Sequence, residues 1–374
     1  MSIVIKEVLT KKELKKFVEF PNIMYKENAY YTPFLFNDEM DLFTKEKNPA
    51  YDFSETKLFL AYIDNKVVGR ICGLINHAYN EKWGKKAIRF NHFDFIDNYE
   101  VSESLFNEVV KWGKEKGLAE IMGPIGFSDM DHEGMLIEGF EELNMSLTYY
   151  NYPYYKDHME RLGLRKDVDW VEYQVMVPKE RDERIARISE HLQKRYGYKV
   201  VFYKKQKPLL EDAKAAFEVV DKEFAKLYGT VPLTEKMVDK TIKDYLPLVN
   251  LKYLCTVKDK NDKVIAFALL LPSFVKALKK SNGRLLPLGI FRLLKALKGK
   301  NDVLEMYWIA VAGEHQNKGV PAIIMDEMLK MFIDNNIKYC ETGPELEKNE
   351  AVQSMWKSFE KRQHRRRRCF IKEI

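Results

Sequence analysis

The sequence predicts a mixed α/β (α+β) protein made of two tandem units, each a mixed central sheet flanked by helices. Three observations support this fold class. At 374 residues the chain is too long for one ordinary core and suits two domains. Its 46% apolar and 32% charged residues are typical of a folded protein. The same order of strands and helices also occurs twice along the chain.

The first half begins its pattern with two apolar runs around Asp64-Asn65, which predict a β-hairpin. An alternating run follows, and then a helical segment with a Ser-x-Ser start and Gly117 at its end. A short apolar run, a second helix and a last strand complete this half. The expected ranges are 58–76 for the hairpin, 88–97 for a strand, 102–117 for a helix, 119–127 for an apolar run, 154–164 for a helix and 171–177 for a strand.

The second half repeats this order around a basic insertion. Its expected ranges are 251–272 for a hairpin, 303–311 for a strand, 322–336 for a helix, 337–343 for a strand and 349–362 for a helix. The segment "PKERD" between the halves is polar and contains a proline. We therefore expect an N-terminal domain over 1–178 and a C-terminal domain over 182–374, with the basic insertion at 273–300.

The N-terminal segment and the cysteines limit the class of protein. Lysine and glutamate are mixed through the first twenty residues, which a signal peptide would not tolerate. The longest uncharged apolar stretch is too short to span a bilayer. Four scattered cysteines without a CxxC pair give little support to a zinc site or a disulfide framework. We expect a cytoplasmic protein without a bound metal.

The turn at 313–322, "GEHQNKGVPA", lies between a predicted strand and a predicted helix and contains Gln316-x-x-Gly319. This arrangement resembles the acetyl-CoA signature of the GNAT (Gcn5-related) N-acetyltransferase superfamily. Glu305 and Val311 have the spacing from this loop that the histone-acetyltransferase branch shows. Asn349, seven residues before Trp356, is similar to the Asn-to-Tyr spacing on the family's last helix. The whole chain resembles a tandem GNAT protein.

The first half resembles the family mainly in its element order. It also has a helix ending of the form Tyr-x-x-x-x-Glu-x-x-Gly, at Tyr155, Glu160 and Gly163. Where a coenzyme loop would lie, the chain has "NYEVSES", and its glutamates would repel a diphosphate. We therefore expect one coenzyme loop, in the C-terminal domain only.

The loop chemistry supports the same interpretation without the family name. Unpaired N–H groups and the dipole at a helix N-terminus attract a diphosphate, and glycine lets it approach the main chain closely. An isolated QxxG would more often be a plain turn; the flanking strand and helix favour a coenzyme loop. The expected acetyl-CoA or acyl-CoA contacts are Val311, Gln316, Asn317, Lys318, Gly319, Val320, Ala322, Asn349 and Trp356.

Pro321 stands where the family usually has Gly or Ala, and it removes one amide donor. Such a donor to a charged group contributes about 1.5–3 kcal/mol. Proline nevertheless suits the first turn of a helix, so the loop should keep its shape. Lys318 and the basic insertion are candidates to compensate by contacting phosphates.

Glu305 is the predicted general base for an amine acceptor, directly or through water. The alternative is a solvated or salt-bridged strand carboxylate. The resemblance implies that main-chain amides near 310–312 polarise the thioester carbonyl. The resemblance implies a tyrosine as general acid for the leaving thiolate, but this chain has Trp356 there, which cannot donate a useful proton. Either water or another residue protonates the thiolate, or catalysis is slow or lost.

In the first half, the loop 123–135 holds Asp129, Asp131, His132 and Glu133. Adjacent residues on a loop seldom converge on one metal ion, so we favour a polar loop that faces the interdomain cleft and holds a cationic or amine substrate. His132 alone is more often structural than catalytic.

Two segments of the chain are strongly basic. Residues 273–300 hold eight Lys/Arg and no acid, and residues 361–374 hold seven Lys/Arg and one acid. The first contains an amphipathic helix with its apolar face at Ile290, Leu293, Leu294 and Leu297. It is a candidate lid, membrane-surface helix or homodimer contact, or is simply buried against the domain. The "RRRR" at 365–368 is more often a solvated strand or tail than a nucleic-acid site.

These observations lead to one main functional hypothesis and two alternatives. The main hypothesis is an acyl-CoA-dependent N-acyltransferase acting on a small-molecule or peptide amine. The alternatives are a non-catalytic binding protein with the same fold, favoured by Pro321 and Trp356, and a nucleic-acid or membrane-surface module that uses the basic segments. The acceptor and the acyl length stay open.

Overall fold

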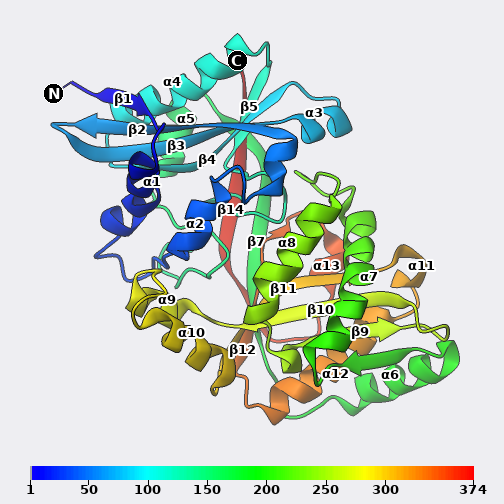
Figure 1. Ribbon diagram of the computed structural model, residues 1–374. Coiled ribbons are helices and arrows are strands. Elements are labelled where there is room, and N and C mark those ends of the chain that lie inside the picture. The colour runs from blue at the N-terminus through cyan, green and yellow to red at the C-terminus, as the bar shows by residue number, and fades with distance from the viewer. Residues whose placement is uncertain (1) are drawn as a thin grey trace.

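One sheet runs through the whole molecule in the computed structural model, which describes residues 2–374 (Figure 1). Its strand order is β1-β2-β3-β4-β5-β14-β7-β12-β11-β10-β9-β8, with β6 paired to β14 and β13 paired to β7. The strands are β1 Val4–Glu7, β2 Ser54–Ile63, β3 Lys66–Asn76, β4 Ala87–Phe95, β5 Glu120–Gly123, β6 Met135–Glu138, β7 Arg165–Met176, β8 Lys199–Phe202, β9 Leu254–Lys258, β10 Val264–Pro272, β11 Val303–Val311, β12 Tyr339–Thr342, β13 Glu345–Leu346 and β14 Lys361–Glu373.

Helices cover both halves of this sheet. They are α1 Lys11–Met24, α2 Phe36–Leu42, α3 His77–Trp83, α4 Tyr99–Glu115, α5 Tyr155–Arg161, α6 Glu183–Tyr196, α7 Gln206–Phe224, α8 Glu235–Tyr245, α9 Val275–Ser281, α10 Gly289–Lys298, α11 Gly313–Gln316, α12 Val320–Asp334 and α13 Glu350–Ser354. Short 3-10 helices lie at Pro49–Asp52, Leu246–Leu248 and Leu251–Tyr253. The mixed α/β class with helices on a mixed sheet is confirmed.

Local chemistry explains the N-terminal half. Asp64 and Asn65 both have positive φ, of 48° and 62°, as the tight turn of the β2–β3 hairpin requires. Helix α4 starts earlier than predicted because Asn98, not a serine, caps it by accepting from Glu100 N at 3.0 Å. Its apolar stripe packs on the sheet. Val109 lies so close to Gly73 that a Cβ at position 73 would be 3.0 Å from Val109 Cγ1.

The C-terminal half follows the same logic around β9, β10 and β11. Strand β11 occupies the predicted range, and α12 begins two residues before the predicted start. The buried side chains of α12 recur three or four residues apart, which places one face of the helix on the sheet. These buried apolar residues are Val320, Ile323, Ile324, Met328, Leu329 and Phe332.

The two halves are joined by an exchange of strands at the centre of the sheet. β14, from the end of the sequence, lies between β5 and β7 and so completes the sheet of the N-terminal half. β7, from the first half, pairs on its other edge with β12 of the second half. The domain boundary near residues 178–182 stays a prediction. The position of β14 shows that the chain returns to the sheet of the N-terminal half after this boundary.

Two sequence expectations were wrong in this region. The helix expected over 349–362 is limited to α13, and β14 begins at Lys361. The arginines of "RRRR" are not a solvated tail, because Arg365 and Arg367 are 1% and 0% exposed inside the sheet. Strand pairing on both edges of β14 outweighed the polar composition that suggested a surface segment.

Glu172 on β7 forms ion pairs with both buried arginines. Its carboxylate accepts from Arg365 Nε at 2.5 Å and also from Arg367 Nε, and all three side chains are fully buried. Burial alone would raise the pKa of Glu172, but the two guanidinium groups hold it at about 2. The carboxylate is therefore charged at neutral pH, and its two ion pairs link β7 to β14.

We expect Glu172→Gln to lower the free energy of unfolding by about 3–5 kcal/mol, because it leaves the buried guanidinium of Arg367 without a carboxylate and that of Arg365 with Glu341 alone. Urea unfolding followed by circular dichroism measures this. Glu142→Gln is the matched control: Glu142 pairs with Arg362, on the same strand, but Arg362 is half exposed. This change should cost no more than about 1 kcal/mol. Equal losses in both variants would show that the buried pair is not special.

Candidate active site

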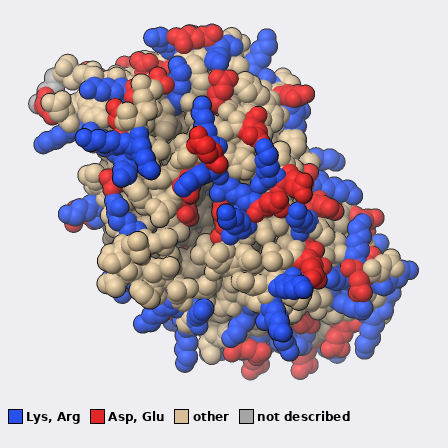
Figure 2. All heavy atoms as spheres, viewed as in Figure 1, with Lys and Arg blue, Asp and Glu red and all other residues tan. Residues whose placement is uncertain are grey.

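A cavity lined by both halves of the chain lies where β11 and β12 diverge. The two strands pair in parallel from Val303 to Met306, and Gly343 N donates to Met306 O at 3.1 Å as the last link. Beyond that point the strands separate, and a cavity of about 460 Å³ opens between them. Its volume is within the usual range for small-molecule sites. In Figure 2 the surface is hollowed between the two halves of the molecule.

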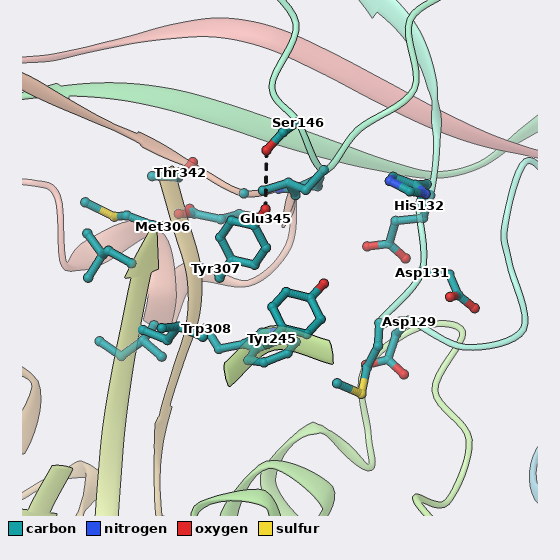
Figure 3. A pocket seen from close by; sticks show the side chains of 18 of the residues that line it. Asp129, Asp131, His132, Ser146, Tyr245, Met306, Tyr307, Trp308, Thr342 and Glu345 are labelled. Carbon is teal, nitrogen blue, oxygen red and sulfur yellow. Dashed lines mark hydrogen bonds between the residues drawn. The ribbon is translucent and has the colours of Figure 1, made fainter. Parts of the chain in front are cut away.

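Both halves contribute to the cavity walls. The N-terminal half supplies residues around Phe34 and the loop from Asp129 to Glu133. The C-terminal half supplies β10, β11, α12 and the insertion helices α9 and α10. Figure 3 shows Asp129, Asp131 and His132 on one side of the cavity, opposite Tyr307 and Tyr245. The polar loop thus lines the cavity together with residues of the second half of the chain.

Among the described residues, the lining combines acidic and apolar side chains and includes no lysine or arginine. Most of the exposed lining is apolar, from aromatic, leucine and methionine side chains. The carboxylic acids among the lining residues are Asp38, Glu39, Asp129, Asp131, Glu133, Asp244 and Glu345. A positively charged group attached to an apolar body is the ligand type that such a surface complements.

Burial changes the protonation of these groups. It raises the pKa of Asp129 to about 6, and that of Glu133 well above its usual value. Burial lowers the pKa of His132 to about 4, so its imidazole is neutral at pH 7. Glu133 Oε2 has no hydrogen-bond partner in the described structure. An incoming cation would favour the ionised carboxylates and supply the missing partner.

Glu305, the predicted base, lies directly behind the cavity wall. Its side chain is 1% exposed and is not among the lining residues. Ser146, which does line the cavity, donates through Oγ to Glu305 Oε2 at 2.7 Å, and Ser146 N donates at 3.3 Å. Burial raises the pKa of Glu305 to about 7. The hydroxyl of Ser146 therefore links this carboxyl to the cavity.

Tyr307 is the second hydroxyl group at this point. Its OH lies 3.3 Å from Ser146 Oγ, as the dashed line in Figure 3 marks. Burial raises the pKa of Tyr307 well above its usual value, so the phenol stays neutral. Ser146 thus lies between one ionisable carboxyl and one neutral phenol.

Glu345 is a second buried carboxyl group with access to the cavity. Burial raises its pKa to about 7, and Trp356 Nε1 donates to its Oε1 at 2.7 Å. Its other oxygen, Oε2, has no partner in the described structure. Trp356 is 3% exposed and lines the cavity beside Asn349, whose Oδ1 caps α13. Trp356 thus holds a carboxyl group at the position where the sequence lacked an acid.

The predicted coenzyme loop forms the start of α12. Gly319 has φ 75° as the N-cap residue, and Pro321 lies in the first turn, where proline is tolerated. The described hydrogen bonds leave the N–H groups of Gly319, Val320 and Ala322 without a protein acceptor. Farther along, Ile324 and Met325 line the cavity, so one helix connects the loop with the cavity.

A carboxylate occupies the first part of this loop. Glu223 of α7 accepts from Gly313 N at 2.8 Å and from Gln316 Nε2 at 3.0 Å. Gln316 Nε2 also donates to Val311 O at 3.0 Å, which fixes the side chain across the turn. Glu223 shows that this turn can hold an anionic oxygen at its N–H groups.

Several details differ from the sequence expectations. Ala312 N donates to Ile265 O at 2.8 Å, so this amide is not free to polarise a carbonyl. Asn317 ends α11, and Lys318 Nζ lies 5.9 Å from the Tyr196 ring centre. In Figure 1 the basic insertion, α9 and α10, lies on the opposite side of the C-terminal half from α11, so it cannot compensate for Pro321 at the loop.

Sequence reasoning missed Ser146, Tyr307, Glu345 and Glu223. Ser146 belongs to an irregular loop of the other half, and Glu223 to a helix about ninety residues before the loop that it contacts. Neither residue belongs to a sequence motif whose spacing would predict its place in the site. The described residues include no group of three His, Cys, Asp or Glu side chains that could hold a metal ion.

Sequence comparisons find distant relatives of this chain. No family model matches the chain. Protein YghO of Escherichia coli is 24% identical over 379 residues, covering 99% of this chain and 95% of that protein. A bacterial ceramide synthase of Caulobacter vibrioides is 26% identical over 300 residues, covering 78% and 76% of the two chains.

Among solved structures, a tandem GNAT protein from the clavulanic acid biosynthesis pathway matches 100% of this chain and 98% of its own. The TM-score is 0.57 and the sequence identity is 9%. The match covers both halves of the chain. The chain therefore has the tandem GNAT fold.

Proposed function

We propose that this protein is an acyl-CoA-dependent N-acyltransferase whose acceptor is an amine with a long apolar substituent. The observation that carries the proposal is the cavity between the diverging strands, which joins an acidic wall to an apolar one. The tandem GNAT fold supports acyl-CoA as the donor. The relative named as a ceramide synthase supports the acceptor class, because a ceramide is the amide of a long-chain amino alcohol.

The donor fits the loop and the cavity together. Phosphate groups would accept from the free N–H groups at the start of α12, where the helix dipole also favours an anion. The thioester would then lie in the cavity that Ile324 and Met325 line farther along the helix. A cavity of about 460 Å³ with apolar walls is larger than an acetyl group needs, so we favour a longer acyl chain.

The acceptor would bind with its ammonium group toward the acids of the N-terminal half. One proton must leave the ammonium before its nitrogen lone pair can attack the thioester carbon. We assign this step to Ser146 Oγ, which takes the proton while its own passes to Glu305. A C–N bond forms and the C–S bond breaks, and the released thiolate takes a proton from Glu345. The attacking nitrogen gives its second proton to the Glu345 carboxylate formed in this way, and Glu305 then releases the first proton to solvent.

The coenzyme-loop assignment predicts that Gly319→Glu abolishes acyl-CoA binding in calorimetric titration, because it adds a carboxylate and a side chain to the phosphate site. Gly319 has φ 75°, and its Cβ would lie 2.5 Å from Leu192 Cδ1. Gly117→Glu is the matched control, with φ 69° but open space around it. Equal affinity of wild type and Gly319→Glu would remove the loop from the proposal.

The proton path predicts a bell-shaped pH dependence of kcat/KM around pH 7. Glu305 must be ionised, so the rate rises as pH increases through about 7; Glu345 must be protonated, so the rate falls above about 7. Glu305→Gln should remove the rising limb and lower kcat about 10²–10⁴-fold. Glu345→Gln should remove the falling limb. An unchanged profile in both variants would contradict these roles.

The acceptor class predicts a chain-length dependence. Thiol release from palmitoyl-CoA should be faster with sphinganine or dodecylamine than with ethanolamine, since each added buried CH₂ contributes about 0.8 kcal/mol. Asp129→Asn with Asp131→Asn should raise KM for the long-chain amine more than it changes kcat. A preference for the short amine, or turnover with no amine at all, would favour a different acceptor or the non-catalytic alternative.

A further inference from the structure

We infer that the insertion helices α9 and α10 form a docking surface for an anionic lipid bilayer. The inference rests on the outer face of the insertion and not on the acyl-transfer step. No helix in the described part of the chain is long and apolar enough to cross a membrane, so the contact would be at the bilayer surface.

The first observation is a concentration of exposed apolar side chains. Large apolar side chains that are exposed on a protein surface are usually scattered, but five such side chains lie within nine consecutive residues here. Leu286 is 77% exposed and Phe291 66%. The five residues, which we call the apolar tip, are Leu286, Leu288, Ile290, Phe291 and Leu294. Figure 2 shows a tan area with blue side chains along its lower border where Figure 1 places α9 and α10.

The second observation is charge. Residues 273–300 carry eight Lys/Arg and no acid. Arg284 pairs with Glu19, and Lys279 donates to main-chain oxygens of Ala29 and Tyr31, so these two attach the insertion to the N-terminal half. Arg292 donates to Lys280 O. The remaining five form no ion pair within the described residues and stay available to an anionic surface; they are Lys276, Lys280, Lys295, Lys298 and Lys300.

The third observation is that the inner face of the insertion is fixed. Leu293 and Leu297 are each 7% exposed and pack in the core of the C-terminal half. Gly283 O accepts from Phe36 N at 2.9 Å, which ties the turn between α9 and α10 to the N-terminal half. The sequence placed Ile290 and Leu294 on the same apolar face as Leu293 and Leu297, and both are 41% exposed. The helix therefore presents an apolar edge outward without needing to unfold.

An anionic bilayer complements this combination better than a second copy of the chain. Apolar side chains would enter the acyl region while lysine ammonium groups reach the phosphate layer around them. A second copy would bring its own five unpaired lysines to the same contact, and like charges would repel. The insertion also lines the cavity through Phe274, Leu278 and Leu293, so the docked surface would adjoin the site.

The test is co-sedimentation of the full chain with vesicles. We expect binding to equimolar phosphatidylcholine and phosphatidylglycerol vesicles, and at least about tenfold less to phosphatidylcholine alone, with loss of binding at high salt. Leu286→Ser with Leu288→Ser and Phe291→Ser should reduce partitioning at least about tenfold. Lys295→Gln with Lys298→Gln and Lys300→Gln should remove the preference for anionic vesicles.

Leu9→Ser with Ile23→Ser is the control for loss of exposed apolar side chains, since Leu9 and Ile23 are 78% and 70% exposed on the N-terminal half. This variant should bind as wild type does, and circular dichroism should show all variants folded. The inference is overturned if wild type stays in the supernatant, or if the apolar-tip variant binds equally well. A concentration-dependent dimer that the apolar-tip changes abolish, without vesicle binding, would also overturn it and assign the patch to a second copy.

Discussion

The ion pairs of Glu172 with Arg365 and Arg367 are the interaction on which the rest of the architecture depends. They lie between the two central strands, β7 and β14, where each half of the chain gives a strand to the other. Buried charges of this kind are costly alone and tolerated only when they are paired. The register of the exchange is therefore fixed by electrostatics as well as by main-chain hydrogen bonds. That register sets where β12 ends and the cavity begins.

The cavity is a product of this exchange. β12 pairs with β7 on one edge and with β11 on the other, and it can leave β11 after Met306 because its other edge is already held. The N-terminal half then closes the opening with Ser146 and the acidic loop. Neither half contains a complete site. A fold made of two separable copies would not bring Ser146 to Glu305.

The sequence predicted local features well and distant contacts poorly. Periodicity and capping residues located β11 and α12, and Gly319 marked the turn, because these signals lie within a few neighbouring residues. The strand of arginines was misjudged, since its partner Glu172 is 193 residues from Arg365 in the chain. The role of Glu305 as general base stays a prediction. Its link to the cavity runs through Ser146, which no local sequence pattern connects to it.

The place of β14 in the sheet has a consequence for synthesis. A ribosome makes this strand after every other element described here, yet its position is in the middle of the sheet. Until it arrives, the edges of β5 and β7 are open and Glu172 is without its partners. Exposed strand edges invite pairing with other chains. The centre of the nascent sheet must therefore stay incomplete until β14 has been made, and a chaperone that shields strand edges would serve the protein during that interval.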